Sequence, residues 1–274
     1  MPGRPTMAFM EEPITPYAAL FDDLSGVYDQ TGVPFFSVMA RGLVDRLRVQ
    51  PGEKGLDIGS GRGAVTRPLA EDVGPTGRVD AVDLAPGMVR LLGEDTAHLP
   101  HVHVTQSNAA DPRPPAPPYD VIASSMVIFF LDDPTNALAR WRTLLRPGGR
   151  VGVATFRPWY GAWAKLVDLY DELAEDPLPT DDRYATDAGV EQILTGAGFS
   201  EVRTDSAAYV IPFADAEEWR RWSRATPLGG LWRRTPEERH PEIMRRATEL
   251  LEESRDAQGR MVLEVGARYT FGVS

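Results

Sequence analysis

The chain has 274 residues, of which 42% are hydrophobic and 25% charged, an ordinary balance for one large α/β domain with or without a cap. Its 29 Lys and Arg against 40 Asp and Glu give a net charge of −11, which repels a phosphate backbone and argues against a nucleic-acid partner. The absence of cysteine excludes disulfides, Cys-ligated zinc and thiol nucleophiles.

The first residues, MPGRPTMAFMEEPITP, lack the apolar core of a signal peptide. The longest uncharged apolar run covers only residues 121–131, whereas a helix needs about 20 apolar residues to cross a bilayer. We therefore expect no membrane segment and a cytoplasmic location.

Strand and helix patterns alternate over the first 156 residues. Short apolar runs predict strands at 54–58, 77–84, 102–104, 119–127 and 150–156. Helical spacing predicts helices before residue 48 and at 64–73, 85–92 and 136–145. This alternation favours a parallel sheet with helices on both faces.

The pattern changes after residue 156. Two helical stretches, 160–176 and 214–251, interrupt the alternation, with a helix at 187–198 and a strand at 201–213 between them. The chain ends in a strand-like run, 261–273, which we expect to insert antiparallel. The predicted fold class is therefore α/β: a Rossmann-like, seven-stranded, mostly parallel sheet with an antiparallel C-terminal strand and helical cap insertions.

A glycine-rich stretch, GLDIGSGRG (55–63), follows the first predicted strand. From Gly59 to Ala64 it reads G-x-G-x-x-A, which suits a dinucleotide or S-adenosylmethionine, since glycines let main-chain N–H groups approach a ligand. Asp57 decides between them, because a carboxylate repels a pyrophosphate but attracts the ammonium and sulfonium of S-adenosylmethionine. Asp83 ends the second predicted strand, where it can accept hydrogen bonds from both ribose hydroxyls.

In their order and spacing, several motifs resemble those of class I S-adenosylmethionine-dependent methyltransferases. The resemblance is to the small-molecule group that includes quinone-biosynthesis and natural-product tailoring enzymes. The motifs are LDIGSGRG (56–63), VDAVDLAPGMV (79–89), SNAADP (107–112), YDVIASSMVIFFLDDP (119–134) and LLRPGGRVGVATF (144–156). The resemblance implies methyl transfer from S-adenosylmethionine to a small molecule, with S-adenosylhomocysteine as product.

We expect residues 1–274 to form a single methyltransferase domain, in which the insertions emerge at the sheet edge where ligands of open α/β sheets bind. The cofactor-binding core is expected at 28–156, and segments 1–27, 157–180 and 213–257 are expected to form a helical cap over the substrate site. The expected cofactor-binding residues are Tyr28, Asp57, Gly59, Ser60, Gly61, Gly63, Asp83, Leu84, Met88, Asn108, Ala109 and Ser124.

Each of these residues has an expected place. The glycines face the methionine portion near Asp57, Asp83 holds the ribose, and Leu84 and Met88 line the adenine. Asn108 stands where the family usually has an aspartate for the adenine amino group. Ser124 lies at the mouth of the sheet, and Tyr28, in VYDQTG, covers the cofactor.

Simpler roles compete with these expectations. Asp57 could cap a helix, Asp83 could be a turn acid, and Tyr28 could be part of the core. Ser124 and Ser125 stand where metal-dependent relatives place an acid, so no metal is expected.

The acceptor is less well defined than the cofactor. Five tryptophans lie outside the cofactor core and suit a large apolar or aromatic acceptor, although packing of the cap explains them equally well: Trp159, Trp163, Trp219, Trp222 and Trp232. His240, the one histidine in the helical insertions, is the candidate general base. The acceptor atom (oxygen, carbon or nitrogen) and the oligomeric state stay open. So do two alternatives, a fold relative that catalyses a non-methylating isomerisation or cyclisation, and a non-enzymatic binding module.

Overall fold

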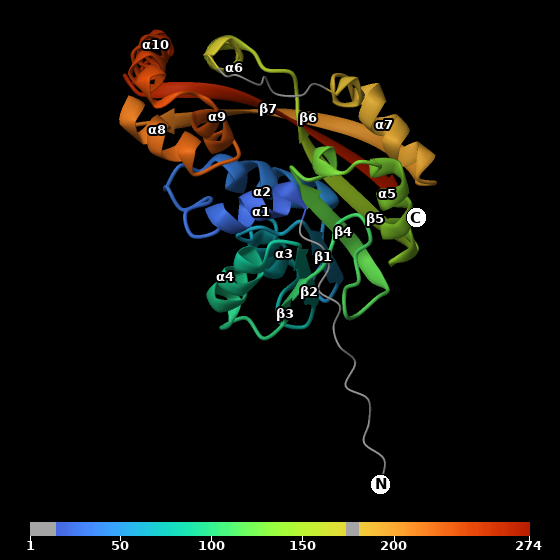
Figure 1. Cartoon of the computed structure of the whole chain (residues 1–274). Coiled ribbons are helices and arrows are strands. Elements are labelled where there is room, and N and C mark those ends of the chain that lie inside the picture. Colours follow the sequence, from blue (N-terminus) through green and yellow to red (C-terminus); the bar gives the residue numbers. More distant parts are fainter. Residues whose placement is uncertain (1–14, 174–180) are drawn as a thin grey trace.

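The computed structural model describes residues 15–173 and 181–274, built around a seven-stranded sheet of order β3-β2-β1-β4-β5-β7-β6 (Figure 1). The strands are β1 (Lys54–Ile58), β2 (Arg78–Asp83), β3 (Val102–Gln106), β4 (Tyr119–Ser125), β5 (Leu145–Phe156), β6 (Ser200–Phe213) and β7 (Met261–Val273). The first five are parallel, and β7 pairs antiparallel with both β5 and β6. The predicted sheet with its antiparallel last strand is confirmed.

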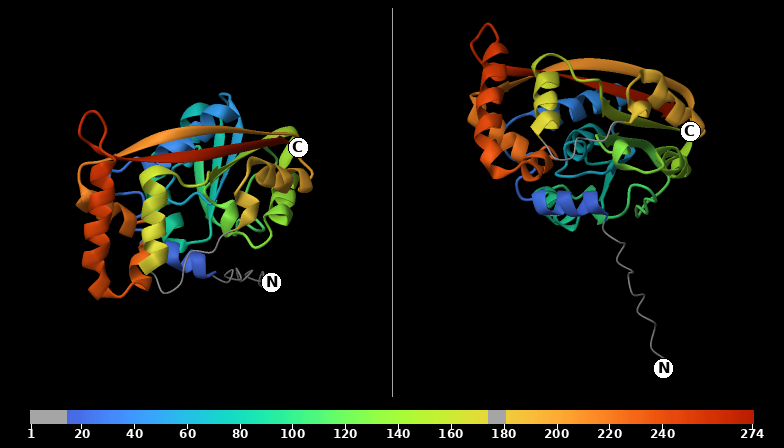
Figure 2. Two further views of the ribbon diagram at one scale, coloured as in Figure 1. Left: turned by 90° about the horizontal axis from the view of Figure 1, so that it is seen from above. Right: turned by 45° about the horizontal axis from the view of Figure 1, so that its top comes forward.

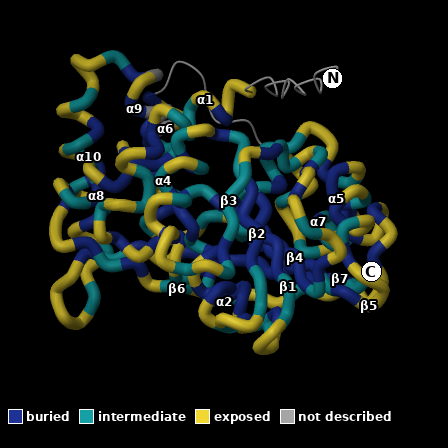
Figure 3. Tube along the Cα trace, turned by 90° about the horizontal axis from the view of Figure 1, so that it is seen from below, coloured by how far each residue is buried: buried dark blue, intermediate teal, exposed yellow. Residues whose placement is uncertain are grey.

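Helices cover both faces of the parallel part of the sheet. The helices that follow the alternation are α2 (Phe35–Leu47), α3 (Thr66–Val73), α4 (Pro86–Thr96), α5 (Pro134–Thr143) and α7 (Asp187–Gly196). One apolar core joins α2 and α3 to the sheet, and a second joins α5 and α7 to its other face. Figure 3 shows the central strands buried beneath helices whose outer faces are exposed.

The alternation of side chains along β1 places Asp57 on the opposite face of the sheet from Leu56 and Ile58. Leu56 and Ile58 pack into the core on the α5 and α7 side. Because successive strand residues point to opposite faces, Asp57 points to the other face, where it meets Thr66 of α3. The position of this carboxyl group therefore follows from the strand period.

The last two strands extend past the end of the parallel sheet. Phe156, the last residue of β5, pairs with Ala267 of β7, whereas the β6–β7 pairing continues to Phe213 and Met261. Three further helices pack against the extended strands, α6 (Gly161–Leu173), α8 (Ala216–Arg224) and α10 (His240–Glu253), and the short helix α9 (Gly229–Arg234) packs against α8. Helix α10 packs against α6 and α8, as Figure 2 shows for the yellow and red-orange helices.

Two predicted helices are shorter than expected. The stretch 214–251 is divided into α8, α9 and α10, since Pro227 and Pro236 interrupt it and Gly229 opens α9. The stretch 160–176 is helical to Leu173, and its last residues lie outside the described residues.

The N-terminal helix and three short 3₁₀ turns complete the described chain. They are α1 (Pro16–Leu24), η1 (Ile128–Phe130), η2 (Asp182–Tyr184) and η3 (Glu237–Arg239). Within residues 15–173 and 181–274, no helix is both long enough and apolar enough to span a membrane.

Candidate functional site

The turn after β1 folds back over the end of β2. The N–H groups of Gly59 and Ser60 donate to the carbonyl of Val82 at 2.8 and 3.0 Å, and the N–H of Gly61 donates to Oδ2 of Asp83 at 2.8 Å. Gly59 has a φ of +74°, and a Cβ there would lie 2.4 Å from Cγ2 of Val127. Only glycine therefore fits at residue 59, and the turn and the acid after β2 form one surface.

Asp57 is fully buried beside this turn. Its Oδ2 accepts a 2.6 Å hydrogen bond from Oγ1 of Thr66, but its Oδ1 has no hydrogen-bond partner among the described residues. Burial raises the pKa of Asp57 to about 7, although hydrogen bonds from Thr66 act in the opposite direction. A role at the first turn of α3 thus accounts for only one carboxyl oxygen.

Ser60 supplies a second unmatched polar atom at the same turn. It is 5% exposed, and in the described part of the chain its Oγ has no partner. Buried polar atoms normally form hydrogen bonds, so these two atoms, one near the end of β1 and one in the turn that follows it, indicate a place for a polar ligand. A ligand with an ammonium group, such as the methionine portion of S-adenosylmethionine, fits the free oxygens of Asp57 and Ser60.

Asp83 is held in one orientation at the end of β2. Its Oδ1 accepts from the N–H of Ala85 at 2.9 Å, and its Oδ2 accepts from Gly61. Burial raises the pKa of Asp83, and these N–H bonds counteract the rise. The bond to Ala85 is the predicted turn contact, but each carboxylate oxygen retains a lone pair that can accept a hydroxyl.

The residues expected around the adenine lie beyond Asp83. Leu84 is half-buried and Met88 is 1% exposed. Oδ1 of Asn108 accepts from the N–H of Ala110 at 2.9 Å, while the carbonyl of Ala109 accepts from Nε1 of Trp141 on α5 at 2.7 Å. The loop after β3 is therefore held by its own turn and by α5.

Ser124 differs from its expected orientation. Its side chain is 1% exposed, and its Oγ donates to the carbonyl of Ile58 at 2.7 Å. The hydroxyl expected at the mouth of the sheet instead ties β4 to the end of β1. The residue sits at the expected strand end, but its hydroxyl points to the carbonyl of Ile58 at the end of β1.

The N-terminal segment is bound to the glycine turn. Oδ1 of Asp22 on α1 accepts from the N–H of Gly87 at the start of α4 at 2.5 Å. Arg62, in the turn itself, donates to the carbonyl of Ser25 and to Oδ2 of Asp95, both at 2.8 Å. These contacts hold residues 16–31 against the loop.

Tyr28 lies over the glycine turn. Its Cε1 is 3.8 Å from the point where a Cβ on Gly61 would lie, and its ring stacks on Phe36 with centroids 5.0 Å apart. Burial raises its pKa well above the usual value, with the charges of Asp29 and Asp83 adding to the rise. The tyrosine is thus both packed in the core and positioned against the loop.

Seven aromatic side chains form a closed ring at the carboxyl edge of the sheet, which we call the aromatic belt. Centroids of successive rings are 4.7–6.1 Å apart. In order around the ring, the belt consists of Phe21, Tyr28, Phe36, Phe35, Phe156, Phe129 and Phe130. Five of them are only half-buried, the exceptions being Phe35 and Phe36.

The sequence did not predict this belt, because the expectation of an aromatic acceptor site rested on the tryptophans. Trp219 and Trp222 of α8 and Trp232 of α9 are at most 2% exposed, and Trp163 of α6 is 4% exposed, so all four are packed inside the protein. The available signal was the paired phenylalanines at 35–36 and 129–130, which follow a loop and a buried strand.

Asp29 is a second residue that sequence reasoning missed. It follows Tyr28 and has a φ of +54°. Burial raises its pKa to about 6, against the opposing effect of the cations Arg67 and Arg62. It is a carboxyl group that titrates near neutrality on the segment that covers the glycine turn.

His240 is the first residue of α10, and its ring makes an edge-to-face contact with Trp232 at a centroid distance of 5.3 Å. Its Nε2 is 2.9 Å from the carbonyl oxygen of Trp232 and 3.1 Å from that of Thr235. Because carbonyl oxygens only accept, Nε2 carries the hydrogen, and a general base at His240 would have to use Nδ1. Its catalytic role stays a prediction.

Metal ligands do not cluster in the part of the chain that the structure describes, where no three His, Asp or Glu side chains are grouped to hold an ion.

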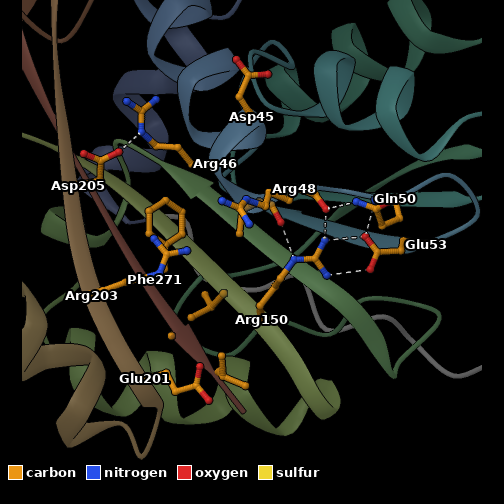
Figure 4. Close-up of a pocket in the computed structure, with 14 residues that line it drawn as sticks. Asp45, Arg46, Arg48, Gln50, Glu53, Arg150, Glu201, Arg203, Asp205 and Phe271 are labelled. Carbon is orange, nitrogen blue, oxygen red and sulfur yellow. Dashed lines mark hydrogen bonds and ion pairs between the residues drawn. The ribbon is translucent and has the colours of Figure 1, made fainter.

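A groove of about 740 Å³ lies at the opposite edge of the sheet (Figure 4). Its charged side chains form ion pairs, Arg150 with Glu53 and Arg46 with Asp205, each at 2.6 Å, and Arg203 lies over the ring of Phe271. Ligands of open α/β sheets bind at the carboxyl ends of the strands, so the candidate site is the glycine turn and the aromatic belt.

Known proteins resemble the chain in both sequence and fold. A methyltransferase domain family matches residues 56–151. Nocamycin O-methyltransferase from Saccharothrix syringae is 36% identical over 231 residues, which cover 78% of this chain and 82% of that protein. Aklanonic acid methyltransferase DauC from Streptomyces sp. strain C5 is 41% identical over 133 residues, covering 48% of this chain and 60% of that protein.

The solved structure of the YcgJ protein from Bacillus subtilis shares the fold with a TM-score of 0.55 and 16% identity. The alignment covers 86% of this chain and 97% of that chain.

Proposed function

Because the chain belongs to the class I S-adenosylmethionine-dependent methyltransferases, we propose that it methylates an aromatic small molecule held by the aromatic belt. S-adenosylmethionine supplies an electrophilic methyl group on a positively charged sulfur. The observation that carries the proposal is the closed ring of seven aromatic side chains beside the glycine turn.

The belt supports an aromatic acceptor through its shape and its chemistry. Aromatic rings attract one another in offset or edge-to-face arrangements with centroids about 4.5–7 Å apart. Five of the seven rings are only half-buried and so retain apolar surface that a ligand can cover. The hydroxyl of Tyr28 is the one polar side-chain atom of the belt, so an apolar, planar acceptor suits it.

The belt also adjoins the proposed cofactor site. Tyr28 belongs to the belt and lies against Gly61. Val127, which contacts Gly59, precedes the turn η1 that holds Phe129 and Phe130. A molecule inside the belt would therefore lie next to the proposed methionine portion of the cofactor.

We propose that the predicted cofactor residues act as a set. The free oxygens of Asp57 and Ser60 would receive the ammonium group, and Asp83 would accept from the ribose hydroxyls. Leu84, Met88 and the loop of Asn108 and Ala109 would enclose the adenine. Ser124 supports the loop by its bond to Ile58.

We propose oxygen as the acceptor atom, on the support of the similarity to a protein named an O-methyltransferase over 82% of its length. An oxygen lone pair forms the new bond to the methyl carbon as the carbon–sulfur bond breaks, and the hydroxyl proton must leave. Asp29 is our candidate to receive it, because its charge acts on Tyr28 of the belt and burial raises its pKa to about 6.

We propose that the cap encloses the acceptor and excludes water. Strand β6 continues beyond the point where β5 ends at Phe156, and helices α8, α9 and α10 follow this continued part of β6. Helix α6 follows the end of β5. The N-terminal segment reaches the same edge through Phe21 and Tyr28. Residues 1–14 and 174–180 of the expected cap lie outside the described residues.

A substrate screen tests this function. The enzyme is incubated with methyl-labelled S-adenosylmethionine and a panel of hydroxylated polycyclic aromatics, and products are identified by mass spectrometry. Phe129→Leu in the belt should raise KM for a methylated acceptor and leave the Kd of S-adenosylhomocysteine unchanged. Phe271→Leu, at the opposite edge, is the matched control. Equal changes in KM in both variants, or products only from non-aromatic acceptors, would refute the belt as the acceptor site.

A further inference from the structure

The indole nitrogen of Trp163 is buried without a hydrogen bond. The residue is 4% exposed, and its Nε1 has no partner in either described stretch. An indole N–H can only donate, and burying it unpaired costs free energy. Because the described part of the protein itself supplies no acceptor, an oxygen atom of a bound ligand is a group that could complete this hydrogen bond.

Other buried tryptophans of the chain have partners. Nε1 of Trp141 donates to the carbonyl of Ala109 at 2.7 Å, and Nε1 of Trp232 donates to Oγ of Ser223 at 3.0 Å. The fold therefore supplies internal acceptors for indole groups elsewhere. Trp163 differs from them in lying beside the aromatic belt.

The ring of Trp163 continues the wall of the belt. It stacks on Phe35 at 5.5 Å and lies 5.1 Å from Trp159, which in turn lies 4.8 Å from Phe156. Phe35 and Phe156 are neighbours within the belt, at 6.1 Å. These four rings close a second, smaller ring that shares one side with the belt.

The described side chains around Nε1–H of Trp163 offer it no hydrogen-bond acceptor. The side chains of Phe35, Phe156 and Trp159 contain no hydrogen-bond acceptor atom, and Trp222, at 5.7 Å, adds another aromatic ring. An oxygen with free lone pairs, on a molecule lying along this wall, would complete the hydrogen bond. A hydrocarbon of the same shape could not.

We propose that Nε1–H of Trp163 is a specificity-determining donor that binds a carbonyl oxygen of the aromatic acceptor. The inference rests on the proposed function, because it places the acceptor against the belt. It narrows the substrate class from aromatic molecules to aromatic ketones, quinones and related carbonyl compounds. The methylated hydroxyl and the recognised carbonyl would be separate groups of one molecule.

The test compares two probes of matched shape, 2-acetylnaphthalene and 2-ethylnaphthalene, which differ by a carbonyl group. Binding to the full-length enzyme saturated with S-adenosylhomocysteine is measured by calorimetry. Trp163→Phe should lower the affinity for the ketone about tenfold and leave the affinity for the hydrocarbon unchanged. Trp222→Phe, which alters a ring in contact with both Phe35 and Trp163, should leave the ratio of the two affinities as in the wild type.

A second measurement uses the wild-type chain with ¹⁵N-labelled tryptophan. An indole N–H resonance should shift downfield with the ketone and not with the hydrocarbon. Three outcomes would overturn the role of Trp163 and leave the aromatic site in place. Trp163→Phe could weaken the binding of both probes equally, it could leave the affinity for the ketone unchanged, or the ketone could fail to shift an indole resonance of the wild type. Failure of both probes to bind the wild-type complex would overturn the aromatic acceptor site and this inference together.

Discussion

The N–H of Gly61 donates to Oδ2 of Asp83 across 2.8 Å and joins the turn after β1 to the acid after β2. Because the other carboxylate oxygen is held by Ala85, the acid cannot rotate without breaking a bond to one of the two loops. A preorganised acceptor of this kind loses little entropy when a hydroxyl-bearing ligand binds.

Replacing Asp83 should weaken cofactor binding. Asp83→Ala removes a charged acceptor and its support for the turn, and we expect a loss of ~1–3 kcal/mol in the affinity for S-adenosylhomocysteine, measured by calorimetry. Glu249→Ala, which removes an exposed acid paired with Arg245 on α10, is the matched control and should bind normally. An unchanged Kd in a folded Asp83 variant would exclude the residue from the site.

Two glycine substitutions in one turn should differ in effect. Gly59→Ala places a Cβ 2.4 Å from Val127 at a φ of +74°, whereas at Gly61, with a φ of +50°, the nearest atom is Tyr28 Cε1 at 3.8 Å. Gly61→Ala should therefore cost only the backbone strain of ~1–2 kcal/mol. Gly59→Ala should cost more and abolish binding, with partial rescue by Val127→Ala. Urea denaturation measures the free energy of unfolding of both variants. An equal loss of stability in the two variants would contradict the contact with Val127.

Asp57 should make the free enzyme less stable as pH rises. Its pKa is raised from 3.8 to about 7, so between these values the folded state keeps a proton that the unfolded state has lost. Its contribution to stability is complete below about pH 4 and is lost as the pH rises through about 7, a change of up to ~4 kcal/mol. Asp57→Asn removes that slope.

The measurement is the difference in unfolding free energy between wild type and Asp57→Asn across pH 4–7.5. Taking the difference cancels the opposite slope of groups such as Asp95, whose pKa is lowered by its hydrogen bond to Arg62. A related readout is cofactor affinity, which should rise through about pH 7 in the wild type and stay level in the variant. Parallel curves for the two proteins would show that Asp57 keeps its ordinary pKa.

Arg62 should couple the N-terminal segment to the cofactor turn. Arg62→Met removes the bonds to Ser25 and Asp95, so amides of residues 16–31 should exchange faster and cofactor affinity should fall by roughly fivefold to tenfold. Arg90→Met, which breaks an exposed pair with Glu94 on α4, is the control and should change neither. Normal exchange at residues 16–31 in the Arg62 variant would show that other contacts hold the segment.

Methyl transfer should continue in the presence of a chelator. The end of β4 carries Ser124 and Ser125 in place of an acid, and the hydroxyl of Ser124 is bonded to Ile58. We expect the rate with EDTA to equal the rate without it, measured with any acceptor from the screen. Activity lost with EDTA and restored by magnesium would show that a metal takes part.

Hydrophobic periodicity predicted the strands and the order of the helices of this protein, and the departure from the usual helix-only crossover before the last strand predicted that this strand inserts antiparallel. Buried strands are rich in apolar residues, and the glycine turn must follow such a strand to meet a ligand, so these features can be recognised locally. The positions of Asp57 and Asp83 at neighbouring strand ends follow from the same pattern, because parallel strands end at one edge of the sheet.

The tertiary structure alone decided which side chains meet at that edge. Phe21, Phe36, Phe129 and Phe156 come from four different segments, and periodicity reports that each is apolar but not which rings it contacts. The same holds for the tryptophans, because a buried indole looks alike in sequence whether it packs a cap or borders a site. The hydroxyl of Ser124 and the ring of His240 are directed by backbone carbonyls, whose positions depend on strand register and on the turn between α9 and α10. Such contacts join residues distant in sequence, and only the packing of the complete chain determines them.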